Sequence, residues 1–295
     1  MGNVMISSDR DEIVRGDQNE GRKVFARGWT SKIYAGGDVD KDRVVKVLDR
    51  DHTAERKGKS ETEIQNYLQS LFDTERRAYE RISSQTSQPD SLLRYYGVDT
   101  MMPRGLSMEL AEGGCFWDHL FVLRGRLPER TAPDMLLKWA RQAAEALAFV
   151  HELGILHCDV HAANFFLDGD QSLKVADFGA ASIDGSKPRL MYRPTHQLWI
   201  KDGSGGWRKD ISIAAEIFAL GSALYNIEAM LEPFQDLIDA SDSGSILQRL
   251  RERQMPDTGG LVLGQVIQRC WRSEYQTMED VLGDIPAATA PRRRS

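Results

Sequence analysis

The chain has 295 residues, of which 41% are hydrophobic, and its formal net charge is −6 at pH 7. This length and composition suit one bilobal unit or two small domains with a proper core. The acidic balance argues against a nucleic-acid-binding protein, and no apolar run approaches the ~20 residues of a membrane-spanning helix. The three cysteines are far apart and form no C-x-x-C pair, and the first residues lack a signal-peptide core. We therefore expect reduced thiols and an intracellular location, cytoplasmic or nuclear.

The N-terminal part of the chain changes from a polar segment to a strand-like one. Residues 1–21 are charged and patternless, which predicts a flexible tail. Residues 24–35 and 43–48 are strand-like, and Gly36 and Gly37 mark a turn between them. The last of these strands carries Lys46 in V-V-K-V. A lysine on a strand is usually a solvated edge residue, so Lys46 gains meaning only from its surroundings.

A long helix is predicted over residues 61–82, where apolar residues recur at steps of three and four. Glu75 falls on the apolar stripe, and a buried carboxylate needs a partner. A lysine on the neighbouring strand would supply one, so we expect Glu75 to pair with Lys46. Glu80 and Glu63 are the alternatives, although a solvated helix face suits both of them better.

The middle of the chain reads as a strand, a turn and a second long helix. The run L-S-M-E-L-A-E-G-G predicts a strand that ends in paired glycines. Residues 133–153 are rich in alanine and apolar on most sides, which predicts a buried helix that begins near Thr131 or Pro133 and stops at Gly154.

The stretch 155–179 carries the residues that are suited to chemistry. Asp159 and Asn164 are close enough to share one rigid loop. The apolar runs 164–167 and 172–176 are separated by Asp-Gly-Asp, which predicts a hairpin that returns Asp177 to the side of Asn164. Carboxylate and amide oxygens suit Mg²⁺, which keeps waters and phosphates as its other ligands. Asp159 would then face an attacking hydroxyl, as phosphoryl transfer requires.

This stretch resembles the two catalytic motifs of eukaryotic protein kinases, H-R-D-x-x-x-x-N and D-F-G. Six positions match: His157, Asp159, Asn164, Asp177, Phe178 and Gly179. Cys158 departs, because it stands where many kinases have arginine. The segments E-R-R-A-Y-E-R-I, R-Y-Y-G-V-D and E-I-F-A-L-G-S-A-L-Y are similar to a divergent group of fungal protein kinases.

The resemblance implies an α+β, bilobal protein-kinase-like fold. The N-lobe, residues 22–108, would be a small antiparallel sheet with one helix, followed by a hinge at 109–114. The mainly helical C-lobe would span residues 115–285, and residues 286–295 would form a basic tail. Residues 211–227 resemble the buried helix beneath the catalytic loop. Glu216 holds the place of the family's Asp, and it is expected to accept hydrogen bonds from the backbone of that loop.

The resemblance also assigns roles to individual residues. Lys46, held by Glu75, would position the α- and β-phosphates of ATP, and Asp159 would accept the proton of the acceptor hydroxyl. His157 would support the loop by packing on Phe178, and Asn164 and Asp177 would hold Mg²⁺. The expected nucleotide-binding residues are Ala26, Gly28, Ser31, Ile33, Val44, Lys46, Met108, Glu109, Ala111 and Phe166.

Several positions depart from the family pattern. Ala26 and Ser31 replace the outer glycines of the phosphate-covering loop, and Val44 replaces a small alanine beside adenine. No A-P-E motif follows Gly179. Because the arginine lost at Cys158 commonly receives an activation-loop phosphate, we expect any activity to be independent of activation-loop phosphorylation.

Three functions remain open at this stage. The first is a protein kinase that uses ATP and Mg²⁺ and acts on a protein substrate, with Ser/Thr preferred to Tyr as the commoner acceptor. The second is a pseudokinase or scaffolding module, which the departures in the glycine loop favour. The third is a small-molecule phosphotransferase, because His161 in D-x-H-x-x-N resembles the loop of aminoglycoside and choline kinases. For His161 itself, a hydrogen-bonding role within the loop is preferred. We expect no nucleic-acid partner and no membrane span, and the sequence leaves the oligomeric state open.

Overall fold

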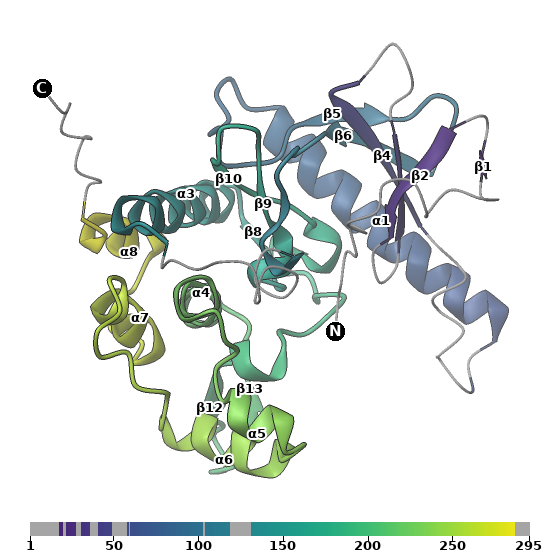
Figure 1. The fold of residues 1–295 in the computed structure, drawn as a ribbon. Helices are drawn as coiled ribbons and strands as arrows, with labels where there is room; N and C mark the ends of the chain where they lie inside the picture. Colours follow the sequence, from purple (N-terminus) through teal and green to yellow (C-terminus); the bar gives the residue numbers. More distant parts are fainter. Residues whose placement is uncertain are drawn as a thin grey trace, which may run out of the picture.

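The computed structural model describes residues 18–19, 22–27, 31–35, 41–48, 58, 60–102, 104–118 and 131–286. These residues form two parts, a β-sheet with one long helix and a mainly helical region (Figure 1). This is the two-part α+β architecture that the sequence predicted.

The sheet has six strands in the order β1-β2-β3-β4-β6-β5, and every neighbouring pair is antiparallel. Its strands are β1 (Gln18–Asn19), β2 (Arg22–Arg27), β3 (Ser31–Ala35), β4 (Arg43–Leu48), β5 (Tyr95–Val98) and β6 (Gly105–Glu109). The strands expected over 24–35 and 43–48 are therefore present. Two residues of the expected N-terminal tail, Gln18 and Asn19, also pair with β2, as the strand β1.

The long helix α1 (Glu61–Ser83) lies beside this sheet (Figure 1). Ser60 and Glu63 form a reciprocal capping box at its N-terminus, which satisfies two backbone donors. Its buried face carries the apolar residues at helical spacing, together with Glu75. Near its C-terminal end, the ring of Tyr79 stacks on Tyr95 at 5.5 Å and meets the edge of Phe178 at 5.2 Å. The helix thereby connects the sheet to the residues that follow Asp177.

The helical region consists of α3 (Pro133–Glu152), α4 (Ile213–Ala229), α5 (Gln235–Asp239), α6 (Ser243–Glu252), α7 (Gly264–Trp271) and α8 (Met278–Asp284). Helix α4 is buried on nearly all sides and packs against α3, α7 and α8. Helix α3 begins at Pro133, as predicted. It ends just before Gly154, whose φ of +69° favours glycine and terminates the helix.

Short strands lie outside the six-stranded sheet. They are β7 (Gly114–Cys115), β8 (Ile155–Leu156), β9 (Phe165–Leu167), β10 (Leu173–Val175), β11 (Ser182–Ile183), β12 (Trp199–Lys201) and β13 (Trp207–Lys209). Strands β9 and β10 pair antiparallel, with Val175 opposite Phe165, so the predicted hairpin is confirmed. The β12–β13 hairpin was not predicted.

One large apolar core joins the two parts, since it contains residues of the sheet, of α1 and of every long helix. Arg81 at the end of α1 adds a polar connection, because it donates hydrogen bonds to Asp184 and to the Leu153 carbonyl. None of the helices in the described ranges is long and apolar enough to cross a membrane.

Candidate active site

A cavity of about 350 Å³ lies between the sheet and the helical region. Strands β2, β3, β4 and β6 supply one side of it, and the segments around Asp159 and Asp177 supply the other. All of the predicted nucleotide-binding residues within the described ranges line it: Ala26, Ser31, Ile33, Val44, Lys46, Met108, Glu109, Ala111 and Phe166. Gly28 lies outside the described residues.

Lys46 stands at the centre of a charged cluster in this cavity. Its Nζ lies 2.8 Å from Glu75 Oε1 and 2.9 Å from Asp177 Oδ1. Burial alone would lower the pKa of Lys46, but the carboxylates of Asp177 and Glu75 outweigh it and raise that pKa, so the lysine is charged. Burial raises the pKa of Glu75 to about 7, against the opposing effect of Lys46. The alternatives to Glu75 are engaged elsewhere: Glu63 caps α1, and Glu80 pairs with Arg76 at 2.9 Å.

The backbone after β10 turns Asp177 toward the cavity. Asp177 has a φ of +69°, in the left-handed region, and its side chain accepts a hydrogen bond from the Gly179 amide. Phe178 points the other way and is fully buried between the rings of Tyr79 and His157, at 5.2 and 4.8 Å. Because Phe178 fills the core, the carboxylate of Asp177 remains on the cavity side with 42% of its side chain exposed. The expected packing of His157 on Phe178 is thus present.

Asp159 is held by its neighbours in the same loop. Asn164 Nδ2 donates to the Asp159 carbonyl at 2.8 Å and to Asp159 Oδ2 at 3.2 Å. His161 Nδ1 accepts a hydrogen bond from the Ala163 amide, so the proton of its neutral ring lies on Nε2, 3.2 Å from Asp159 Oδ1. Burial opposes the ionisation of Asp159, but His161, His157 and Arg193 together hold its pKa well below the usual range. Asp159 is therefore ionised, and its carboxylate is held in a fixed orientation.

The loop rests on Glu216 of the buried helix α4. Glu216 Oε2 accepts from the His157 amide at 2.9 Å, and Oε1 accepts from the Cys158 amide at 2.7 Å. His151 Nε2 and the Tyr192 hydroxyl contact the same carboxylate at 3.0 and 2.7 Å. The expectation that Glu216 accepts hydrogen bonds from the backbone of the loop is confirmed. These bonds hold Cys158 at a φ of +62°, a conformation that a cysteine rarely adopts.

Asn164 and Asp177 have the donor chemistry of a magnesium site. Both line the cavity, and Asn164 donates through its amide nitrogen, which leaves its amide oxygen as the ligand atom. Within the described ranges, no group of three or more His, Cys, Asp or Glu residues forms a self-contained metal centre. A cation held here would take its remaining ligands from water or phosphate oxygens, which suits Mg²⁺.

Three further residues at or near the site did not emerge from sequence reasoning. Tyr192 and Arg193 line the cavity from the segment before the short 3₁₀ turn η4 (Pro194–His196). That segment has no periodicity, so nothing in the sequence singled them out. The third residue, Lys174, lies between two apolar residues in β10. This position in an apolar strand is the pattern that could have indicated a buried, paired lysine.

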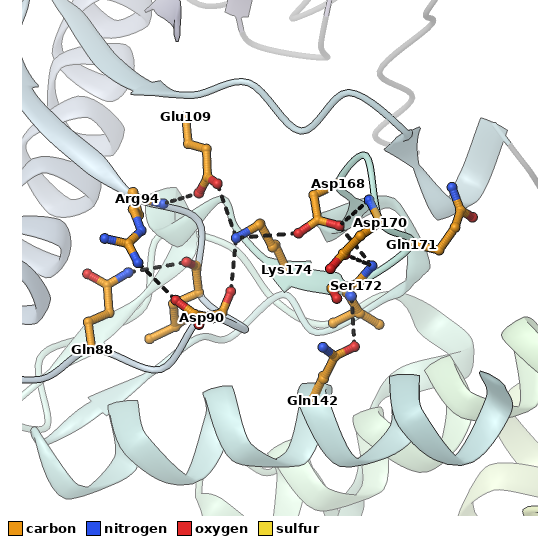
Figure 2. Close-up of polar contacts among 12 residues, drawn as sticks. Gln88, Asp90, Arg94, Glu109, Gln142, Asp168, Asp170, Gln171, Ser172 and Lys174 are labelled. Carbon is orange, nitrogen blue, oxygen red and sulfur yellow. Dashed lines mark hydrogen bonds and ion pairs between the residues drawn. The ribbon is translucent and has the colours of Figure 1, made fainter. Parts of the chain in front are cut away.

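Lys174 anchors the segment that follows β6. Only 5% of it is exposed, and its Nζ lies 3.1 Å from Glu109 Oε1 and 3.7 Å from Asp168 Oδ2. It also donates to the carbonyl of Asp90 at 3.1 Å, and Figure 2 shows it among these three acceptors. Glu109 accepts in addition from the Arg94 amide. The backbone of residues 109–111, one wall of the cavity, is thereby fixed to the β9–β10 hairpin.

The fold and the cavity together define the protein kinase class. The fold has a sheet with one long helix and a helical second part, and the cavity between them is lined by Asp159, Asn164, Asp177 and Lys46. The family described as protein kinase domain matches residues 27–259, which is more than half of the chain. The chain therefore belongs to the protein kinase domain family.

Curated relatives agree with this assignment. CBL-interacting protein kinase 4 of Oryza sativa is 32% identical over 164 residues, covering 55% of this chain and 32% of that protein. CBL-interacting serine/threonine-protein kinase 7 of Arabidopsis thaliana is 30% identical over 172 residues, covering 58% and 36%. Serine/threonine-protein kinase PknL of Mycobacterium tuberculosis is 30% identical over 223 residues, covering 71% and 49%. The chain thus spans about a third to a half of the length of these relatives. They come from plants and a bacterium, so the resemblance to a fungal subgroup stays a prediction.

Proposed function

We propose that this chain is a catalytically active protein kinase that transfers the γ-phosphoryl group of ATP to a serine or threonine hydroxyl of a protein. The observation that carries the proposal is the double contact of Lys46 with Glu75 and Asp177, at 2.8 and 2.9 Å. These residues come from β4, from α1 and from the segment after β10. Their meeting in one cavity supports a site whose parts are arranged for phosphate binding.

Each polar residue of the cavity then has a separate task. Lys46 binds the α- and β-phosphates, and Glu75 keeps its Nζ aimed at them. Asp159, ionised and held by Asn164 and His161, orients the acceptor hydroxyl and takes its proton. Val44, Met108 and Phe166 supply the apolar surface for adenine, and the backbone of residues 109–111 supplies donors and acceptors for its edge. When bound between Asn164 and Asp177, Mg²⁺ supplies charge neutralisation of the phosphates.

The surroundings of Cys158 support activity without activation-loop phosphorylation. The thiol is buried, and burial together with the Glu216 carboxylate raises its pKa, so it is neutral. A phosphate receptor needs a cationic fork at this position, and a neutral thiol offers none. Glu216 instead holds the loop by accepting hydrogen bonds from the His157 and Cys158 amides, and the Tyr192 hydroxyl donates to the same carboxylate. We expect the protein isolated without any phosphate to be as active as the phosphorylated protein.

The contacts of His161 weaken the case for a small-molecule acceptor and so favour a protein acceptor. The resemblance to small-molecule kinases rested on the imidazole at this position. His161 is buried, with 3% of its surface exposed, and its two nitrogens are occupied by the Ala163 amide and the Asp159 carboxylate. The ring therefore orients Asp159, and both of its nitrogens are already engaged within the protein.

Phosphotransfer from γ-labelled ATP tests this function. The chain would be incubated with labelled ATP, Mg²⁺ and a generic protein acceptor, beside Asp159→Asn and the control Asp236→Asn, which changes an exposed acid on α5. We expect transfer by the parent and the control, and a loss of about 10²-fold or more in Asp159→Asn with nucleotide binding retained. A parent that binds ATP and Mg²⁺ but transfers no label to any protein would contradict the proposal and favour a pseudokinase.

A further inference from the structure

The loop that carries Asp159 has no permanent positive charge near the reacting group. Residues 157–164 contain no lysine or arginine. His161, two residues after Asp159, is buried. Its Nδ1 accepts a hydrogen bond from the Ala163 amide, as only an unprotonated nitrogen can. The imidazole is therefore neutral and does not supply the charge that a transferring phosphoryl group needs.

Arg193 brings a cation to this side of the cavity from a distant segment. Its side chain lines the same cavity as Asp159, His161 and Asn164, and only 13% of it is exposed. The guanidinium carbon lies 4.7 Å from the centroid of the Trp117 ring, and Nη1 lies 3.8 Å from Glu232 Oε1. Glu232 is itself held by the Thr195 hydroxyl at 3.1 Å. The guanidinium is thus fixed in position by an aromatic face on one side and a carboxylate on another.

Arg193 interacts electrostatically with Asp159. Burial lowers the pKa of the guanidinium, and the carboxylates of Asp159 and Glu232 oppose this decrease. An arginine remains charged under such conditions because its ordinary pKa exceeds 12. In return, Arg193 is one of the groups that keep Asp159 ionised. Both residues therefore line the cavity as charged groups, one as a base and the other as a permanent cation.

The two permanent cations that line the cavity interact with different carboxylates. Among the described residues that line it, only Lys46 and Arg193 are permanently positive. Lys46 contacts Glu75 and Asp177, on the side where the α- and β-phosphates are expected. Arg193 lines the cavity with Asp159 and acts on its charge, and the terminal phosphate is expected to meet the acceptor hydroxyl beside Asp159.

We propose that Arg193 contacts the γ-phosphoryl group of bound ATP and stabilises its charge during transfer, in the place where the catalytic loop offers only the neutral His161. This inference rests on the proposed kinase activity. In the transfer, the bond between the γ-phosphorus and the bridging oxygen to the β-phosphorus breaks, and a bond from the acceptor oxygen to the γ-phosphorus forms. The hydroxyl proton moves to the Asp159 carboxylate, and ADP leaves with the bridging oxygen and its electron pair. Arg193 is a catalytic residue in this step because it touches the transferred group.

The test compares nucleotides that differ only in the γ-phosphate. Dissociation constants for ADP and for a non-hydrolysable β,γ-imido analogue of ATP would be measured with Mg²⁺ by calorimetry. The parent would be compared with Arg193→Met, Arg193→Lys, Glu232→Gln and the control Arg189→Met. Arg189 is an exposed arginine of the same segment that does not line the cavity. The melting temperature of each variant without nucleotide reports whether it folds.

Arg193→Met should bind the ATP analogue about 10-fold more weakly while its affinity for ADP stays within about 2-fold. Its kcat for protein phosphorylation should fall by about 10²-fold. Arg193→Lys should recover part of both losses, because lysine retains the positive charge but lacks the paired N–H donors of the guanidinium. Arg189→Met should discriminate between the two nucleotides as the parent does, and Glu232→Gln, which removes the carboxylate that holds the guanidinium, should lose part of that discrimination.

Three results would overturn the inference. Equal losses for ADP and the analogue would assign Arg193 a structural role, and unchanged affinities for both would remove it from the phosphate site. A rise in the KM for the protein acceptor alone would make it a residue of acceptor recognition. Failure of the proposed kinase activity would give a result that differs from these three. A parent that transfers no phosphate, but whose preference for the ATP analogue depends on Arg193, would refute the kinase activity and keep the contact.

Discussion

Replacing Glu216 tests whether the catalytic loop is held in place by helix α4. Glu216 is fully buried, and each of its two carboxylate oxygens contacts two donors. Oε1 accepts from the Cys158 amide and the Tyr192 hydroxyl, and Oε2 contacts the His157 amide and His151 Nε2. Glu216→Ala removes both oxygens, whereas Glu216→Gln keeps one and directs an NH₂ group at the two donors of the other.

The expected cost follows from the donors that lose their acceptor. A buried donor without a partner costs about 1–3 kcal/mol, and part of this is recovered because the carboxylate no longer has to be desolvated. Glu216→Ala should therefore lower the free energy of unfolding by about 4 kcal/mol, and Glu216→Gln by about 2 kcal/mol. Phosphotransfer should fall further than the folded fraction, because the backbone of Cys158 relaxes from its left-handed conformation and Asp159 moves with it.

Urea unfolding followed by tryptophan fluorescence measures these costs, beside Glu279→Gln, which changes an exposed glutamate on α8. Activity would be measured without urea on the same preparations and corrected for the folded fraction. A cost below about 1 kcal/mol for Glu216→Ala would refute the reasoning, because the four donors would then have other partners. If the alanine variant does not fold at all, the glutamine variant still decides, since its free energy of unfolding and its activity must both fall below those of the parent and the control.

Two further predictions concern the pH dependence of the Glu216 contribution and the replacement of Lys174. Burial opposes the ionisation of Glu216, but the contacts with His151, His157 and Tyr192 lower its pKa. The ionised Glu216 therefore contributes its full stabilisation above the pKa of glutamate in the unfolded chain, near 4.3, and loses it as the pH falls through the lower pKa of the folded state. The difference in the free energy of unfolding between the parent and Glu216→Gln should thus narrow below about pH 4.5. A gap that widens in urea titrations at pH 4 would contradict this sign. Lys174→Met, which leaves the Glu109 and Asp168 carboxylates without their cation, should cost about 3 kcal/mol in the same assay and weaken ATP binding through the displaced 109–111 backbone. The control Lys187→Met changes an exposed lysine and should leave both unchanged, and equal effects of the two variants would refute the anchoring role.

Local patterns in the sequence were enough for much of the fold. The helical spacing over 61–82 predicted α1, and the Asp-Gly-Asp turn between two apolar runs predicted the β9–β10 hairpin. The β12–β13 hairpin was not predicted, although the sequence contains a signal for it. This signal is the glycine-rich turn between the triplets W-I-K and W-R-K. Charged residues within these triplets hid their alternation.

The sequence by itself determined the residues near Asp159 and Asp177, because their spacing leaves only short-range geometry to be satisfied. It also pointed to the Lys46–Glu75 pair, since a carboxylate on the apolar face of a helix requires a cation. Only the tertiary structure decided which residues from unpatterned segments enter the cavity. Arg193, from the segment after β11, lines the same cavity as Asp159, and Lys174 of β10 contacts Glu109 at the end of β6. Neither position follows from any local period, because both depend on contacts between segments that are distant along the chain.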